Sequence, residues 1–333
     1  KQLLPIAGNE TMLKVTVKRI SHIIPHQQIY VITNDELKHE TVKQVPEIPE
    51  ENIITEPFGR NTAAAIGLGA IYAAESDSSA AMAVFPADHL ILDEEKFISC
   101  VSAAVKSAEE RESLVVFGIK PDRPETGYGH IKAGRKIGCE NGIDIYNADA
   151  FIEKPNPVKA KEFFENGGYY WNSGMFVWKC STIMEAFKVH MNELFTGLQR
   201  IKNADSSKRK QEIREVYDKI DNVSIDYGIM EKADNKIMVR GDFRWDDVGS
   251  WAAMERIWEK DVNGNATQRS FIGIDTRDSV IAGGERLIAA IGISDMIVVA
   301  TDDAVRVCPK ERAQEVKILI KELQKNKLEK YVE

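Results

Sequence analysis

The run Ala80–Phe85 constrains the fold of this chain more than any other stretch, because six apolar residues stand together and then stop at Pro86. An unbroken apolar run of this length is typical of a strand buried on both faces, as in a parallel sheet. Pro86 ends the strand because proline has no N–H to donate to a neighbouring strand. Asp88 is therefore predicted to follow the carboxyl end of a central strand, where open α/β sheets bind ligands.

The position of Asp88 has two interpretations. A carboxylate beyond a strand end can hold Mg²⁺, which prefers oxygen ligands and often bridges to substrate phosphates. An aspartate can also be the N-cap of the helix that follows. The stretch by itself leaves both interpretations open.

The first 260 residues alternate strands with helices, the pattern of a doubly wound, mostly parallel sheet in the α/β class. We predict helices over 12–20, 63–74, 94–111, 157–166, 182–190, 208–220 and 224–231. We predict strands over 28–33, 52–55, 80–85, 114–119, 126–131, 148–154 and 236–239.

The character of the chain changes after about Asp261, where the apolar runs become short and closely spaced. Strands are predicted over 270–274, 279–282, 287–291, 296–300 and 304–308, with turns at 283–284 and 302–303. Pro309 then opens a final helix. The range 261–333 is thus predicted to be a small β-rich domain or β-solenoid that ends in a helix.

Charge and cysteine content exclude several classes of protein. The formal net charge is −8, from 44 basic and 52 acidic residues, and no basic block occurs, so nucleic-acid binding is not favoured. The four cysteines are far apart and do not cluster with the six histidines, which argues against a zinc site and a disulfide framework. No stretch reaches the length of a membrane span, and the start is unlike a signal peptide. We expect a cytoplasmic protein.

A second acidic site, Asp246–Asp247, follows a later predicted strand. Two carboxylates from separate strand ends can share one Mg²⁺ and leave positions for phosphate oxygens. Glu153, Lys154 and Asn172 lie between the two acidic sites in the sequence. Glutamate and asparagine suit sugar hydroxyls, because each makes several hydrogen bonds, and lysine offers a point charge for a phosphate. The alternative for Glu153–Lys154 is an exposed cross-strand charge pair.

Seven segments carry a resemblance to a known family. They read PADH at 86–89, EPxxRNTA at 56–63, RPETGYGHI at 123–131, FIEKP at 151–155, WNSGMF at 171–176, SIDYGIMEK at 224–232 and WDDVGSW at 245–251. In this order they resemble the mannose-1-phosphate guanylyltransferases over roughly residues 1–258, and the later strands fit that family's small C-terminal domain. The resemblance implies a nucleotidyltransferase fold of the glycosyltransferase-A kind. It also implies that GTP and mannose 1-phosphate give GDP-mannose and pyrophosphate.

The resemblance also assigns site residues. It implies that Asp88 and Asp247 bind the metal, with Asp246 the less favoured partner, and that Lys1 neutralises the α-phosphate. It places the purine nucleotide, together with Asp88, at Arg60, Asn61 and Thr62. It places the sugar phosphate at Gly129, Glu153, Lys154, Asn172 and Asp226. Asp226 also fits an ordinary acid in the first turn of a helix. Trp171, Phe176 and Trp178 are predicted to be core residues.

One departure from the family pattern concerns the start of the chain. The family's Gly-rich loop, GGxGxRxxP, is not present, and Lys1 matches the lysine that closes it. We expect residues before Lys1 that carry this loop and a first strand. We also expect an empty central position, or a long groove, beside the strand that leads to Asp88.

Three other functions stay open. The same chemistry could use another hexose 1-phosphate or another nucleotide, although the Arg60–Thr62 loop favours a purine. A metal-dependent glycosyltransferase shares the fold, but such enzymes usually carry a DxD triplet, which PADH is not. A binding or regulatory relative without turnover is the non-enzymatic alternative. A homodimer through the C-terminal β region is a further prediction.

Overall fold

The computed structural model describes residues 1–6, 8, 10–268, 270–283 and 286–331. The chain forms two compact units, Lys1–Trp245 and Asp246–Glu333. The division predicted from sequence at residue 260 falls inside the second of these units. Each unit is described by itself below.

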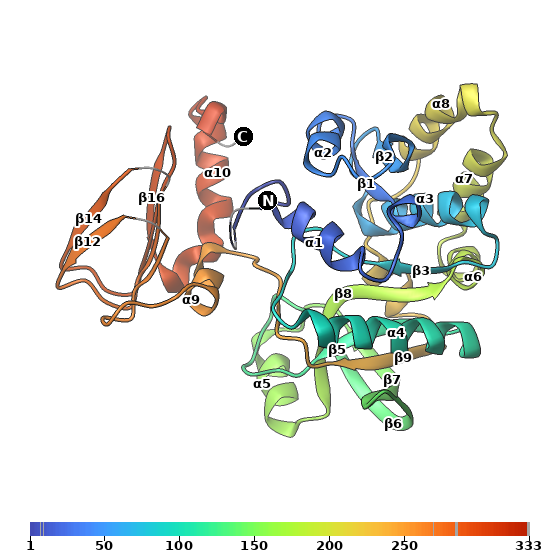
Figure 1. Cartoon of the computed structure of the whole chain (residues 1–333), viewed down its shortest axis with the longest axis horizontal. Helices are drawn as coiled ribbons and strands as arrows, with labels where there is room; N and C mark the ends of the chain where they lie inside the picture. Colours follow the sequence, from blue (N-terminus) through green and yellow to red (C-terminus); the bar gives the residue numbers. More distant parts are fainter. Residues whose placement is uncertain (7, 9, 269, 284–285, 332–333) are drawn as a thin grey trace. The chain divides into compact units, whose positions relative to one another are not determined.

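The first unit is built of helices on both faces of a sheet (Figure 1). Its helices are α1 Met12–Ile20, α2 Lys38–Gln44, α3 Asn61–Ser76, α4 Glu94–Arg111, α5 Pro157–Asn166, α6 Cys180–His190, α7 Asn192–Asn203 and α8 Ser206–Tyr217. Its strands are β1 Val31–Asn34, β2 Ile53–Glu56, β3 Ala81–Val84, β4 Leu90–Ile91, β5 Leu114–Ile119, β6 His130–Glu140, β7 Ile143–Ile152, β8 Tyr169–Lys179, β9 Lys236–Gly241 and β10 Trp245–Asp246, which crosses into the second unit.

The central sheet is mixed, in the order β3-β8-β5-β9-β7-β6. Strands β5 and β9 are parallel neighbours, whereas β8 runs antiparallel to both β3 and β5, and β7 runs antiparallel to β6 and β9. The predicted α/β class is confirmed. The expectation of a mostly parallel sheet needs correction, because β8 is inserted between two strands that run in the same direction.

The apolar run around Ala83 forms β3, but β3 is not central. It lies at one end of the six-stranded sheet, and each of its four residues is only partly buried. All six residues of β5, by contrast, are buried. An apolar run predicts burial on both faces of a sheet, and burial on both faces does not require a strand neighbour on both edges.

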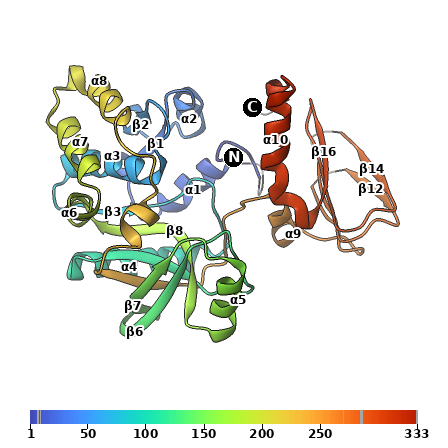
Figure 2. The ribbon, with the colours of Figure 1, turned by 180° about the vertical axis from the view of Figure 1, so that it is seen from behind.

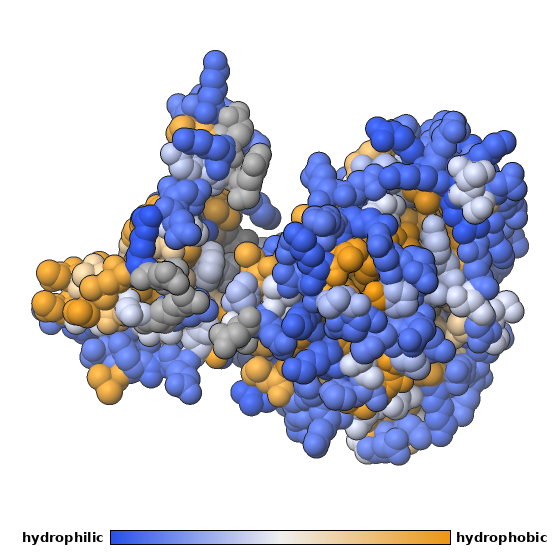
Figure 3. Space-filling model, turned by 45° about the horizontal axis from the view of Figure 1, so that its top comes forward, coloured by the Kyte–Doolittle hydropathy of each residue, from blue (hydrophilic) through white to orange (hydrophobic). Residues whose placement is uncertain are grey.

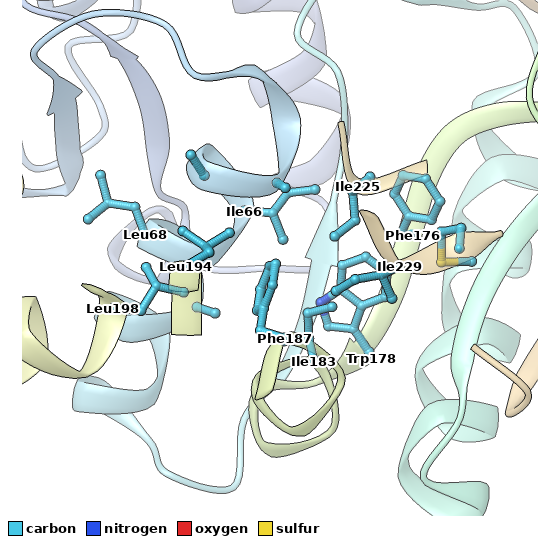
Figure 4. Packing of buried hydrophobic residues seen from close by; sticks show 14 of the residues in the cluster. Ile66, Leu68, Phe176, Trp178, Ile183, Phe187, Leu194, Leu198, Ile225 and Ile229 are labelled. Carbon is cyan, nitrogen blue, oxygen red and sulfur yellow. The ribbon is translucent and has the colours of Figure 1, made fainter. Parts of the chain in front are cut away.

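Two hydrophobic cores cover the two faces of the sheet. Figure 4 shows part of one core, in which Phe176 and Trp178 of β8 meet side chains of α3, α6 and α7. The other core lies against α1 and α4, and Figure 2 shows α4 running beside the strands. Trp171, Phe176 and Trp178 are 4%, 2% and 0% exposed, so their prediction as core residues is confirmed.

The longest hairpin of the first unit joins β6 to β7 through Asn141 and Gly142. Both turn residues have positive φ, 50° and 81°. Asn-Gly is the preferred pair for a two-residue hairpin turn, because both central positions of such a turn need positive φ. Of the strand expected over 126–131, only residues 130–131 lie in β6, and of the strand expected over 148–154, residues 148–152 lie in β7. Both observed strands extend to the Asn-Gly turn, and this pair is the signal in the sequence that indicates the hairpin.

The second unit is a small, mostly parallel β structure, in which only β16 pairs antiparallel among the described strands, and a helix follows it. Its elements are α9 Met254–Ile257, β11 Ala266–Gln268, β12 Phe271–Ile274, β13 Val280–Gly283, β14 Ile288–Ile291, β15 Met296–Ala300, β16 Val305–Pro309 and α10 Val316–Lys325. Strands β11, β13 and β15 stack in parallel, and β12 stacks on β14, so successive coils lie on one another as in a solenoid. The predicted small C-terminal β domain is confirmed. The turn predicted at 283–284 lies partly outside the described residues.

Within the described ranges, no helix combines the length and the apolar composition that crossing a bilayer requires.

Candidate active site

Asp88 lies in the short segment between β3 and β4 and pairs with the start of the chain. Its Oδ2 is 3.0 Å from Lys1 Nζ, and its side chain is 33% exposed. The N-cap of α4 is Asp93, whose side chain accepts a hydrogen bond from the Lys96 N–H. The alternative that Asp88 caps the next helix is therefore wrong, and its partly exposed carboxylate is paired with Lys1 instead.

The next residue, His89, is fixed by an aromatic neighbour. Trp245 Nε1 donates to His89 Nδ1 over 3.1 Å, and the two rings meet edge to face. Because Nδ1 accepts, a neutral His89 carries its proton on Nε2. A Cβ built at Gly174 would lie 3.7 Å from both Pro86 Cγ and His89 Cε1, so β8 passes directly beneath this segment. Gly174 thus links the Asp88 segment to the residues around Asn172.

Four of the predicted sugar-site residues lie together around Asn172. Asn172 Nδ2 donates to Asp226 Oδ1 over 2.8 Å, and the Asn172 backbone N–H donates to the Gly129 carbonyl over 2.7 Å. A Cβ built at Gly129 would overlap Glu153 Oε2 and would lie 3.2 Å from Asn172 Cβ. Residues that are far apart in the sequence therefore form one polar cluster, which we call the Asn172 cluster (Gly129, Glu153, Asn172 and Asp226).

Two carboxyls of the Asn172 cluster are held in an environment that disfavours their charge. The side chain of Glu153 is 7% exposed, and burial, followed by the nearby Asp226 charge, raises the pKa of Glu153. Burial also raises the pKa of Asp226. Lys154 Nζ lies 3.2 Å from Glu153 Oε1 and moderates both effects. Glu153 Oε2 is buried and has no hydrogen-bond partner among the described residues. A buried acceptor without a donor is rare in folded proteins, and here it borders the position that only a glycine leaves open.

Glu231 is a member of this site that the sequence analysis did not identify. Its Oε1 accepts a hydrogen bond from the Glu153 backbone N–H over 2.9 Å. Glu231 follows one π-helical turn, Asp226–Met230, in place of the helix predicted over 224–231. Such turns are rare and occur often at functional sites. The segment SIDYGIMEK contained the signal, because it holds two acids of which only Asp226 was chosen.

The loop after β2 ends at Arg60, which is the N-cap of α3, and Asn61 and Thr62 are the first residues of that helix. Arg60 and Thr62 contact two distant segments of the chain. Arg60 Nε donates to the Tyr217 carbonyl over 2.6 Å, and the Arg60 guanidinium lies 5.0 Å from the centre of the Phe58 ring. Thr62 Oγ1 accepts from the Ile225 backbone N–H over 2.9 Å, directly before Asp226. Asn61 has a φ of 66°. The loop is thus held beside the Asn172 cluster, and its contact with a nucleotide remains a prediction.

The two acidic residues at the start of the second unit, Asp246 and Asp247, make different contacts. Asp246 Oδ2 accepts from Arg256 Nε over 2.8 Å, and Asp246 Oδ1 accepts from the Val248 N–H, so Asp246 is a structural carboxylate. Asp247 Oδ1 accepts from the Gly249 N–H over 3.0 Å. Asp88 belongs to the first unit and Asp247 to the second, so a shared Mg²⁺ remains a prediction. The described residues contain no group of three or more His, Cys, Asp or Glu side chains that could hold a metal by themselves.

These side chains are suited to bind two kinds of chemical group. In the Asn172 cluster, Glu153 Oε2 lacks a donor among the described residues, and the hydroxyl groups of a sugar are donors of the right kind. The Asp88 segment and Lys1 place one carboxylate and one ammonium beyond β3, which suits the charges of a phosphate and a hard cation.

Comparison with known proteins agrees with this arrangement. Residues 1–264 match the model of the nucleotidyl transferase family, and residues 269–323 match that of the MannoseP isomerase/GMP-like beta-helix domain. The chain is 36% identical to xanthan biosynthesis protein XanB of Xanthomonas campestris pv. campestris (strain B100) over 97% of this chain and 68% of that protein. It is 34% identical to mannose-1-phosphate guanylyltransferase of Escherichia coli over 99% of this chain and 70% of that protein.

A solved structure is similar to this chain over most of its length. The Thermus thermophilus protein described as a mannose-1-phosphate geranyltransferase superimposes with a TM-score of 0.85, at 32% identity, over 95% of this chain and 90% of that one.

The fold and the site therefore define a nucleotidyltransferase. Within that class, the extent of these matches places the chain in one family: it belongs to the mannose-1-phosphate guanylyltransferases. The family predicted from the seven sequence segments is confirmed.

Proposed function

We propose that this enzyme joins GTP to mannose 1-phosphate and releases pyrophosphate, and that the Asn172 cluster holds the sugar. The observation that carries the proposal is the buried Glu153 Oε2, an acceptor without a donor beside the open position at Gly129. A sugar hydroxyl in that position would supply the missing hydrogen bond. Asn172 and Asp226, already joined to each other, would bind the neighbouring hydroxyls.

The phosphates are proposed to lie between the Asn172 cluster and Asp88. Lys154 carries an exposed ammonium at the edge of the cluster, suited to the sugar phosphate. Lys1, 3.0 Å from Asp88, is placed to neutralise a second phosphate. The nucleotide is assigned to Arg60, Asn61 and Thr62, which form the N-cap and the first two residues of α3, where anions are favoured.

Mg²⁺ is the proposed cofactor, with Asp88 and Asp247 as its protein ligands. The donor chemistry fits, since both are carboxylates and Mg²⁺ usually takes one or two of these together with substrate phosphates and water. When bound, the ion would neutralise charge on the phosphates. Asp246 is left out because its carboxylate is already paired with Arg256.

The reaction needs no covalent intermediate with the enzyme. A phosphate oxygen of mannose 1-phosphate attacks the α-phosphorus of GTP. The bond from the α-phosphorus to the bridging oxygen breaks, and that oxygen leaves with pyrophosphate. The chain contributes by holding the two substrates in line and by offsetting negative charge with Lys1 and Lys154.

Pyrophosphate release from purified protein, GTP, mannose 1-phosphate and Mg²⁺ tests this proposal, with GDP-mannose identified by mass spectrometry. Parallel reactions replace mannose 1-phosphate by glucose 1-phosphate, and GTP by UTP or dTTP. We expect the GTP and mannose 1-phosphate pair to give the highest kcat/KM by at least about tenfold, a difference of about 1.4 kcal/mol. A faster reaction with a pyrimidine nucleotide or another sugar would replace the proposed substrates with that pair.

Two further predictions concern the location and the assembly of the enzyme. We expect a cytoplasmic location, and the four free thiols are in keeping with it. The proposed homodimer would use the second unit, where Ile272, Ile274 and Ile291 are 59%, 57% and 73% exposed. Figure 3 shows apolar side chains gathered at the end of this unit where β12 and β14 lie. Exposed apolar groups of this kind often mark an interface.

A further inference from the structure

Four aromatic side chains of the first unit form a continuous row. The rings of Trp171 and Tyr128 meet edge to face, with their centres 5.3 Å apart. The Trp245 ring continues the row, at 5.1 Å from the Tyr128 ring and 5.4 Å from the His89 ring, again edge to face. Aromatic pairs favour this geometry. The aromatic row (Trp171, Tyr128, Trp245 and His89) therefore connects four segments that are far apart in the sequence.

The rings of the aromatic row are carried by the same backbone segments as the candidate active site. Three of them are direct sequence neighbours of site residues: Trp171 of Asn172, Tyr128 of Gly129 and His89 of Asp88. A displacement of one of these rings would move the backbone of a site residue. The row thus links the side of the site proposed for the sugar to the side proposed for the phosphates.

Trp245 also forms a hydrogen bond to His89. Its Nε1 donates to His89 Nδ1 over 3.1 Å. An indole N–H can only donate, so this bond needs an unprotonated Nδ1 and leaves the proton of neutral His89 on Nε2. His89 Nε2 lies 3.9 Å from Asp88 Oδ1. The Trp245 N–H thereby places an N–H group, and not a lone pair, on the side of the Asp88 carboxylate.

The backbone holds Trp245 beside the segment that follows His89. The Leu92 N–H donates to the Arg244 carbonyl over 3.2 Å, directly before Trp245. The indole and the imidazole therefore stand on two backbone segments that are bonded to each other. Their contact is consequently part of the fold.

We propose that Trp245 is a positioning residue of this enzyme and acts through two parts of its side chain. Its N–H sets the tautomer of His89 and thereby orients Asp88. Its ring supports Tyr128 and thereby the Gly129 backbone. The kinetic consequence rests on the proposed function, in which Asp88 serves the phosphates and Gly129 borders the sugar. The N–H should therefore contribute to kcat, and the ring to the KM for mannose 1-phosphate.

Two substitutions separate these contributions. Trp245→Phe keeps an aromatic ring and removes the N–H, so kcat should fall at least about tenfold while the KM for mannose 1-phosphate changes less than about threefold. Trp245→Leu removes the ring as well, so it should lower kcat and also raise that KM at least about tenfold.

Trp178→Phe is the matched control for the loss of an indole N–H. Trp178 belongs to the core, and its Nε1 is buried without a hydrogen-bond partner among the described residues. Both kcat and KM of this variant should stay within about twofold of the parent.

A double-mutant cycle tests whether the N–H of Trp245 acts through His89. His89→Phe keeps a ring in the row and removes both nitrogens. In a protein that carries His89→Phe, the further change Trp245→Phe should leave kcat as it is, because the two residues act as one unit. Losses of kcat that multiply would overturn the proposal, and so would an unchanged kcat in a folded Trp245→Phe protein.

The tautomer of His89 is measured without any substrate. Long-range proton–nitrogen correlation spectra of histidine-labelled protein at pH 8 show which ring nitrogen carries the proton, and His89→Phe assigns the signals. We expect the Nε2–H form of His89 to exceed the Nδ1–H form at least about tenfold in the parent, and this ratio to fall in Trp245→Phe. A parent protein with the proton on Nδ1 would overturn the proposal. This result holds if a variant does not fold, and it holds if the substrates prove to be a different nucleotide and sugar phosphate.

Discussion

Asn172 Nδ2 donates a hydrogen bond to Asp226 Oδ1 over 2.8 Å, and this contact joins a strand of the central sheet to a π-helical turn 54 residues further along the chain. The bond orients both side chains, because Asn172 Oδ1 also accepts a hydrogen bond from the Gly174 N–H over 3.0 Å. Asp226 consequently has a defined direction in a site where burial disfavours its charge. The hydrogen bond therefore fixes the direction of Asp226 within the proposed sugar site.

The first prediction concerns the stability of the substrate-free protein. Burial raises the pKa of Glu153 and Asp226, so the folded state holds these protons more tightly than the unfolded chain does. The contribution of the pair to the free energy of unfolding therefore increases as the pH falls through the raised pKa values, and levels off below the ordinary carboxyl pKa. Asp226→Asn should reduce this dependence, measured as the difference in melting temperature between pH 5 and pH 8.

The control for that variant is Asp221→Asn, because Asp221 is exposed. It should leave the pH dependence as in the parent protein. If the difference in melting temperature between pH 5 and pH 8 is unchanged in the Asp226→Asn protein, the conclusion that the charged form of Asp226 destabilises the fold is contradicted.

The second prediction concerns the nucleotide. Arg60→Ala removes the hydrogen bond to the Tyr217 carbonyl and the contact with Phe58, and so loosens the loop before α3. Loss of a hydrogen bond from a charged group costs about 1.5–3 kcal/mol. We expect the KM for GTP to rise roughly tenfold or more, with a smaller change for mannose 1-phosphate.

Arg200→Ala is the matched control, since Arg200 forms ion pairs on the surface of α7 with Glu212 and Glu215. Its KM values should stay close to those of the parent. If Arg60→Ala raises both KM values equally, the loop supports the whole site and does not select the nucleotide.

The sequence predicted the bounds of some single elements well and the order of the strands in the sheet poorly. Helix α4 and strand β15 both have the predicted bounds. Each is marked by a local pattern of apolar residues that depends on that element alone. The insertion of β8 between β3 and β5 was not foreseen, since strand order depends on packing between distant segments. The apolar run at Ala83 therefore predicted a strand correctly and its place in the sheet incorrectly.

The candidate site also contains residues that were predicted and one that was not. Glu153, Asn172 and Asp226 were brought together by resemblance, because nothing in their spacing of 19 and 54 residues shows that they meet. Glu231 was missed, since its role is to fix the backbone of Glu153, and a side chain that orients another leaves no local pattern. Asp93 and not Asp88 caps α4, a distinction that depends on where the helix begins.

The third prediction concerns the metal. Asp88→Asn and Asp247→Asn should each lower kcat by at least about 100-fold and weaken the dependence of turnover on Mg²⁺, because each removes a proposed carboxylate ligand. Their melting temperatures should stay within about 2 °C of the parent. Magnesium titrations of initial rate, together with thermal melting, measure both effects.

Asp246→Asn gives the opposite pattern. It leaves Arg256 without its carboxylate partner, so it should lower the melting temperature and change the response to Mg²⁺ little. An Asp247→Asn enzyme that keeps the parent's magnesium dependence would remove Asp247 from the metal site.

The fourth prediction concerns assembly. The double substitution Ile274→Lys and Ile291→Lys places two charges on the exposed apolar face of β12 and β14 and should convert a dimer to a monomer. Sedimentation equilibrium measures the mass directly. Val158→Lys is the control, because Val158 is 77% exposed in the first unit. A double variant with the mass of the parent would exclude this face as the dimer interface.

The fifth prediction concerns Gly129. A side chain there would occupy the space that borders Glu153 Oε2 and Asn172, which is where the sugar is proposed to bind. Gly127→Ala is the matched control, because its Cβ would meet the end of the Glu125 side chain, which can move aside.

Calorimetric titration of mannose 1-phosphate into the parent, Gly129→Ala and Gly127→Ala proteins tests the central claim most directly. The account predicts that Gly129→Ala weakens binding at least about tenfold, or about 1.4 kcal/mol, while Gly127→Ala and the parent bind alike. GTP titrated into the same three proteins should give similar affinities. Unchanged binding of mannose 1-phosphate by a folded Gly129→Ala protein would contradict the assignment of the Asn172 cluster as the sugar site.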